Sequence, residues 1–199
     1  MKTILITLFL ILVLSSFTTQ DNIQRKATVD AISDIPVFMY AEPLAKYKVV
    51  GKAVTMGNIL KMMIDEEKTI REKAQDIVAK TFERKKNGKI GDFDAIIFDF
   101  EKEKILAIKF EEELSTKAKI SSYEGVVIYF FSSPDDEYDI VAKLPADYSM
   151  RAERNGTLDD KILSMVRRSI KKNESGEVGD FDAIIFSPDD LSQTLIKFK

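Results

Sequence analysis

Aspartates at a repeated spacing are the residues of this chain best suited to chemistry. The octapeptide GDFDAIIF occurs twice, at residues 91–98 and 179–186, and each copy contains two aspartates separated by one residue. Because residues two apart on an extended strand lie on the same face, each pair could act as general acid and base or bind a hard cation. The residues of the repeated motif are Gly91, Asp92 and Asp94 in the first copy and Gly179, Asp180 and Asp182 in the second.

A structural interpretation of these residues is favoured over a catalytic one. An aspartate beside a glycine at the entrance of a strand is ordinarily a turn former whose carboxylate binds backbone amides. The motif is also kept in both copies, whereas a single active site needs only one. We therefore expect Asp94 and Asp182 to stabilise the fold, with similar importance in the two copies, and we assign no catalytic residue.

The chain contains neither cysteine nor histidine, which narrows the possible chemistry further. Zinc, copper and iron sites rely on thiolate or imidazole ligands, and serine or cysteine nucleophiles usually need a histidine partner. The segment SPDD, at residues 133–136 and 187–190, lacks the ligand spacing of an EF-hand loop, and its proline favours a turn. The sequence thus predicts no metal site and no cofactor.

The motif belongs to a longer internal repeat. The tripeptide IKF at residues 108–110 recurs at 196–198, at the same offset of 88 residues as the octapeptide, and farther upstream the offset becomes 91. A repeat of this length suits a small domain. We expect repeat 1 over residues 35–110, a linker over 111–123 and repeat 2 over 124–199.

The first twenty residues predict an export signal. Lys2 supplies a positive amino end, and the apolar segment at residues 4–14 is too short to span a bilayer comfortably. Residues 21–34 are polar and predict a flexible leader. We expect a periplasmic or secreted protein with no membrane span after signal cleavage, and an uncleaved N-terminal anchor is the alternative.

The net charge of the chain limits the kinds of partner that it is expected to bind. Because Lys2 is the only charged residue of the signal, its removal changes the formal net charge from −3 to −4, and the mature chain has no strongly basic cluster. The sequence therefore predicts no nucleic-acid partner. Asn155 and Asn173 each begin a glycosylation sequon, and both also suit helix boundaries.

Hydrophobic periodicity predicts the same order of elements in both repeats. Strands at residues 37–40 and 47–54 are expected to pair as a hairpin, followed by a helix over 66–86 with Asp65 as N-cap. The second helix is expected to begin at a capping box formed by Thr157 and Asp160. The fold class is thus α+β, with two tandem ββαββ repeats, each a four-stranded sheet with one helix on a face, packed as a pseudo-symmetric pair. The repeats could join their sheets edge to edge or pack face to face, and the apolar GDFDAIIF strand favours burial of both of its faces.

A charged helix end followed by Gly-x-x-Asp-Ala-Ile-Ile resembles the small bacterial YbjQ-type domains, and the chain also resembles exported bacterial tandem-repeat proteins of unknown function. The heavy-metal binding that the first family's label implies does not transfer to a chain without cysteine and histidine. The residues that carry the resemblance are Asp94, Ala95, Ile96 and Ile97, with Asp182, Ala183, Ile184 and Ile185.

Three functions are compatible with the sequence. The favoured one is an exported, non-enzymatic module that binds an unknown protein or small ligand at the joint between the repeats. The alternatives are a carboxylate-dependent hydrolase with one degenerate repeat and a purely structural accessory protein of the envelope.

Overall fold

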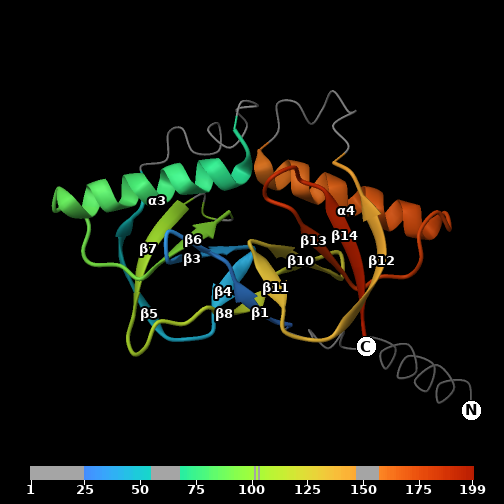
Figure 1. The fold of residues 1–199 in the computed structure, drawn as a ribbon, viewed down its shortest axis with the longest axis horizontal. Helices are drawn as coiled ribbons and strands as arrows, with labels where there is room; N and C mark the ends of the chain where they lie inside the picture. Colours follow the sequence, from blue (N-terminus) through green and yellow to red (C-terminus); the bar gives the residue numbers. More distant parts are fainter. Residues whose placement is uncertain (1–24, 55–67, 101, 103, 147–156) are drawn as a thin grey trace, which may run out of the picture.

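The computed structural model describes residues 25–54, 68–100, 102, 104–146 and 157–199. The predicted export signal, the first residues of the predicted leader, Asp65 and Asn155 lie outside the described residues. The fold is α+β with two helices and mostly sheet, as the sequence predicts (Figure 1).

The described elements are two helices and fourteen strands. The helices are α3 (Ile70–Lys86) and α4 (Leu158–Glu174). The strands before α3 are β1 (Lys26–Val29), β2 (Ala31–Ile32), β3 (Ile35–Met39), β4 (Ala41–Pro43) and β5 (Tyr47–Lys52). Between the helices lie β6 (Ala95–Asp99), β7 (Lys104–Phe110), β8 (Lys117–Ile120), β9 (Ser122–Tyr123), β10 (Val126–Phe130), β11 (Ser132–Pro134) and β12 (Tyr138–Leu144). Strands β13 (Ala183–Phe186) and β14 (Gln193–Phe198) follow α4.

The larger sheet has ten strands and a mirrored order. Its path is β12-β14-β13-β10-β3-β6-β7-β5, and β2 and β9 pair with β3 and β10 beside this path. Strand β3 pairs in parallel with β6, and β10 pairs in parallel with β13. The two halves of the sheet meet edge to edge at its centre, where Met39 on β3 pairs with Phe130 on β10.

The expected hairpin between the strands at 37–40 and 47–54 is wrong. Strand β3 pairs with β6 and β10, and β5 pairs with β7 at the outer edge of the sheet. Burial explains the difference. All five residues of β3 are buried, which suits the centre of the sheet, whereas β5 has exposed residues and lies at an edge with only one neighbour.

A second sheet of four strands, in the order β11-β1-β8-β4, corrects the expectation that residues 21–34 and 111–123 are only a leader and a linker. Strands β1 and β8 have the sequences KATV and KAKI, in which every second side chain is buried. This alternation is the period of a half-buried strand, although each segment is too short to stand out against its lysines. Strand β1 pairs with β8 and β11, and β4 pairs with β8, so segments from both halves of the chain alternate across this sheet.

The elements form three layers. Helices α3 and α4 lie along one face of the ten-stranded sheet with their N-terminal ends meeting at its centre, and the four-stranded sheet lies on the opposite side (Figure 1). One buried cluster joins the helices to the large sheet, and a second joins the two sheets. Both faces of β6 are therefore covered, and its side chains at 95–98 are buried.

Each helix begins at a capping box. Helix α4 starts after Thr157, whose side chain accepts from the Asp160 amide while the Asp160 carboxylate accepts from the Thr157 amide, as predicted. Helix α3 starts later than predicted, because the N-cap is Thr69, which exchanges the same pair of bonds with Glu72. Satisfying two otherwise unpaired amides at the start explains why the helix begins there.

The bounds of the elements recur at fixed offsets. Adding 91 to the bounds of β1, β2, β3 and β4 gives those of β8, β9, β10 and β11, and adding 88 to the bounds of α3 gives those of α4. Backbone conformation recurs too, since Tyr40 and Phe131 lie 91 residues apart and both have positive φ, 55° and 52°. Strands β8 and β9, which lie in the segment expected to be a linker, thus have the same lengths and the same spacing as β1 and β2.

Candidate functional site

The inner aspartates of the motif bind backbone at the end of the neighbouring strand. Asp94 accepts a hydrogen bond from the Phe110 amide at 2.9 Å, and Asp182 accepts one from the Phe198 amide at 3.0 Å. Lys109 also lies 3.4 Å from the Asp94 carboxylate. Each of these carboxylates thus joins the start of one strand to the end of the next.

The outer aspartates lie at the surface and bind other partners. Asp92 forms an ion pair with Lys85 of α3 at 2.9 Å, and this bond lowers the pKa of the Asp92 carboxyl. Asp180 accepts a hydrogen bond from the Asn173 side chain at 3.2 Å. In the first copy the outer aspartate binds α3 and the inner one binds β7, whereas in the second copy Asp180 also lies 3.8 Å from the Lys197 ammonium on β14, the strand that Asp182 binds.

The motif glycines lie where the turn passes close to an edge strand. A Cβ added at Gly91 would lie 3.6 Å from Val50, and one added at Gly179 would lie 3.2 Å from Val141. These residues therefore position the strand that follows. Among the residues that the structure describes, no group of three or more acidic side chains is arranged to hold a metal ion.

A cavity of about 850 Å³ lies where the two halves of the chain meet, and we call it the joint cavity. Its walls come from strands β4 through β10 and from the first turns of α4. Of the GDFDAIIF residues 91–98, only Ile97 and Phe98 line this cavity, with apolar side chains. The polar and aromatic lining residues outside the motif are Tyr40, Glu42, Tyr47, Asp99, Phe100, Lys102, Lys119, Ser121, Ser122, Tyr123 and Asp159.

Tyr40 connects the two halves at this cavity. Its hydroxyl donates a hydrogen bond to the Asp159 carboxylate on α4 at 2.8 Å, and its ring stacks on Phe100 with centroids 4.6 Å apart. Burial and the nearby Asp159 charge raise the pKa of the Tyr40 hydroxyl well above its ordinary value. A bulky residue at φ 55° is uncommon, and such backbone persists only where packing holds it in place.

Charged residues contribute another part of the cavity wall. Asp99 accepts a hydrogen bond from the Lys102 amide and forms an ion pair with the Lys102 ammonium at 3.0 Å. Burial alone would raise the pKa of Asp99, but these bonds from Lys102 lower it. Burial also raises the pKa of Tyr47, and the negative charge of Glu42 raises it further.

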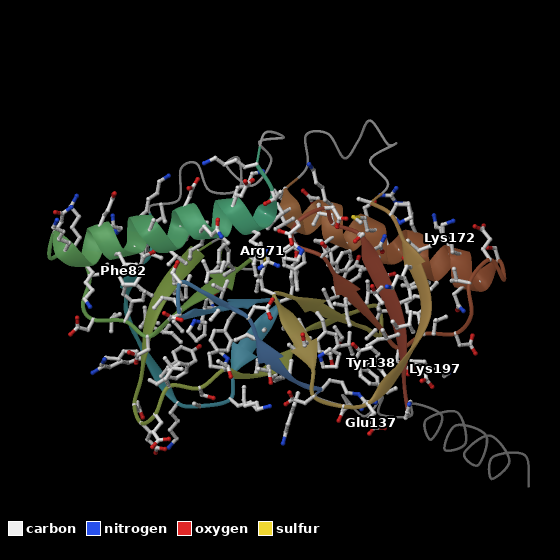
Figure 2. The ribbon with its side chains drawn as sticks, viewed as in Figure 1. Arg71, Phe82, Glu137, Tyr138, Lys172 and Lys197 are labelled. Atoms are coloured by element: carbon white, nitrogen blue, oxygen red, sulfur yellow. The ribbon has the colours of Figure 1, made fainter. Side chains whose placement is uncertain are left out.

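An arginine takes the corresponding helix position in the second half. Arg71 is the second residue of α3, as Asp159 is the second residue of α4. The guanidinium of Arg71 binds Asp189 at 2.8 Å and lies 5.5 Å from the ring centroid of Phe131, the counterpart of Tyr40. The Arg71 amide donates to the carbonyl of Pro188, so α3 is tied to the turn between β13 and β14. Figure 2 shows Arg71 where the N-terminal ends of the helices meet.

Sequence reasoning located the acidic motif and proposed binding at the joint between the repeats, but it identified none of the residues that line the joint cavity. Its residues come from many elements that are far apart in the chain, and no short pattern connects them. One signal was present at corresponding helix positions, where an arginine in one repeat answers an aspartate in the other. A reversal of charge between copies indicates that the two joints differ.

No family model, curated protein sequence or solved structure matches this chain. The class of protein is therefore defined by its own fold and site: in the residues that the structure describes, it is an α+β protein with two helices over a ten-stranded sheet and a cavity where its halves meet. Within the described part of the chain, no helix has the length and hydrophobicity needed to cross a membrane.

Proposed function

We propose that this chain is an exported, non-enzymatic binding protein, built from two tandem copies of a ββαββ-containing domain, that holds a small ligand in the joint cavity. The observation that carries this proposal is the joint cavity itself. Its volume of about 850 Å³ falls within the range of small-molecule sites, and both polar and apolar side chains line it.

The duplication is supported by the recurring element bounds and by the mirrored strand order. Each copy would extend beyond ββαββ, because β1 and β8 precede the core strands at equivalent places. The exchange of β1 and β8 across the four-stranded sheet makes the joint a rigid place for a binding site.

A non-enzymatic role is favoured because the motif aspartates are engaged in structural contacts. Asp94 and Asp182 bind backbone amides, and Asp92 is paired with a lysine. The joint cavity contains carboxylates and tyrosines, but the hydroxyl of Tyr40 already donates to Asp159, which suits positioning more than proton transfer.

Filling the cavity tests this function with a matched control. Leu106 lines the joint cavity on β7, and Thr194 is its counterpart on β14, each opposite the third residue of the paired strand. Leu106→Trp should occupy the cavity, whereas Thr194→Trp adds a tryptophan at the corresponding place of the other half.

The assay is recovery of small molecules from an extract of the native organism. Each protein is incubated with the polar extract and desalted, and the compounds released on denaturation are identified by mass spectrometry. We expect the parent protein and Thr194→Trp to retain the same compound and Leu106→Trp to lose it. Equal retention by all three proteins, or no retained compound from any folded variant, would refute binding in this cavity.

A further inference from the structure

The charges that line the joint cavity are unequal. Three carboxylates face two ammonium groups, and one of these, on Lys102, is already bound to Asp99 at 3.0 Å. Among the described residues, neither Glu42 nor Asp159 forms an ion pair. Lys119 is the other cation among the described lining residues, and it lies directly across from Glu42 in the strand register.

Aromatic rings stand beside these carboxylates. Tyr47 and Phe100 are half-buried in the cavity wall, and Phe100 is held in place by its stack on Tyr40. A ring face next to a carboxylate attracts a cation through the ring quadrupole and the full negative charge together. After burial, the charge of Glu42 is the largest cause of the raised pKa of the Tyr47 hydroxyl, in keeping with a negative potential at this wall.

The second half of the molecule contains an internal counterpart of such a complex. There the helix residue equivalent to Asp159 is Arg71, and its guanidinium lies over the ring of Phe131 and binds the carboxylate of Asp189. The protein thus supplies its own cation at the second joint. At the first joint the same helix position contributes a negative charge, and a cavity remains open beside it.

We infer that the joint cavity binds an organic cation, an aliphatic ammonium or guanidinium group, in the place that Arg71 takes in the other half. This inference rests on the binding function proposed above and names the chemistry of its ligand. Glu42 and Asp159 bind the charged group, and Tyr47 and Phe100 contact its apolar stem. The same group could belong to a free polyamine or to a lysine or arginine side chain of a peptide.

Calorimetric titration with four defined probes tests the inference. Spermidine represents free polyamines, acetyl-Gly-Arg-Gly-amide represents peptide side chains, and maltose and glutarate are a neutral and an anionic control. We expect at least one of the two cationic probes to bind the full chain, more weakly as salt is added, and neither control to bind. The stronger of the two cationic probes identifies the source of the group.

Two variants and one control assign the binding to the cavity. Glu42→Gln and Asp159→Asn should each weaken the cationic probe by roughly tenfold, the effect of removing one nearby opposite charge in a partly solvated site. In Asp159→Asn the side-chain amide oxygen can still accept from Tyr40, so this contact between the halves is retained. Glu83→Gln, on the exposed face of α3, removes the same charge away from the cavity and should leave the affinity unchanged.

The outcomes distinguish a failure of this inference from a failure of the proposed binding function. Binding of maltose or glutarate that Leu106→Trp abolishes, with no binding of either cation, would overturn the inference and keep the binding function. Cation affinity that falls equally in Glu42→Gln and Glu83→Gln would overturn it as well, because attraction to the net negative surface would then be the cause. Binding of no probe would also overturn it, and the extract experiment alone would decide whether the cavity holds a ligand of another class.

Discussion

Replacing Asp94 with alanine tests whether the repeated acidic motif is structural. The carboxylate accepts from the Phe110 amide at 2.9 Å and is only 26% exposed, so alanine leaves this amide with poor access to water. A partly buried amide that loses its partner costs about 1 to 2 kcal/mol of the free energy of unfolding. For a chain of this size that corresponds to a fall in Tm of roughly 2 to 8 °C.

The second copy should respond less. Asp182 makes the equivalent bond to Phe198 at 3.0 Å, but its side chain is exposed. Water can therefore replace the lost acceptor at this site. The symmetry of the repeat alone predicts similar losses at both positions, whereas the structure predicts a larger loss for Asp94→Ala than for Asp182→Ala.

Asp94→Asn is the matched control, because its amide oxygen can still accept from Phe110 and only the contact with Lys109 is lost. An exposed ion pair of this kind is worth about 0 to 1 kcal/mol. Chemical denaturation of the three variants and the parent measures the free energy of unfolding. If Asp94→Ala unfolds at the parental midpoint, or if Asp94→Asn loses as much as Asp94→Ala, the hydrogen-bond explanation is refuted.

Two further predictions concern the packing of the sheets. A Cβ on Gly51 would lie 2.5 Å from Ile90 Cγ2, so Gly51→Ala should lower the free energy of unfolding by about 1 to 3 kcal/mol. The double variant with Ile90→Ala should lose less than the sum of the two single changes in a double-mutant cycle measured by denaturation. Additive losses would show that the contact is not the cause. Residues 25–113 and 114–199, made as separate fragments, should each fail to unfold cooperatively, because β1 and β4 of the first fragment pair with strands of the second. Mixing the two fragments should restore a cooperative melt by circular dichroism. Independent melting of both fragments at the temperature of the full chain would contradict this.

Local chemistry made some elements predictable. The capping box of α4 at Thr157 was visible in the sequence, because both of its partners lie within four residues and need nothing from the rest of the fold. The α+β class followed from helical and strand periodicities that are equally local. The start of α3 was misplaced at Asp65, although Thr69 and Glu72 have the same capping-box spacing as Thr157 and Asp160 and this signal was also present in the sequence.

Strand partners were not predictable in the same way. The sequence predicts a strand at residues 37–40, but the choice of β6 and β10 as neighbours of β3, rather than β5, depends on burial of whole faces across the molecule. The short strands β1 and β8 are stable only because they alternate with β11 and β4 from opposite halves of the chain. Isolated segments of this length do not hold a strand, so their own residues carry little signal.

The sequence by itself determined the repeated aspartate motif, the helices that precede it and the exclusion of thiolate and imidazole chemistry, since each depends on which residues are present and how they are spaced. Only the tertiary structure decided that Asp94 binds a backbone amide and that Tyr40 meets Asp159 across the joint, 119 residues away along the chain. The reason is that a cavity forms where packed elements leave space between their surfaces. Which surfaces meet is decided by long-range pairing of strands, and that pairing is a balance of burial over the whole chain.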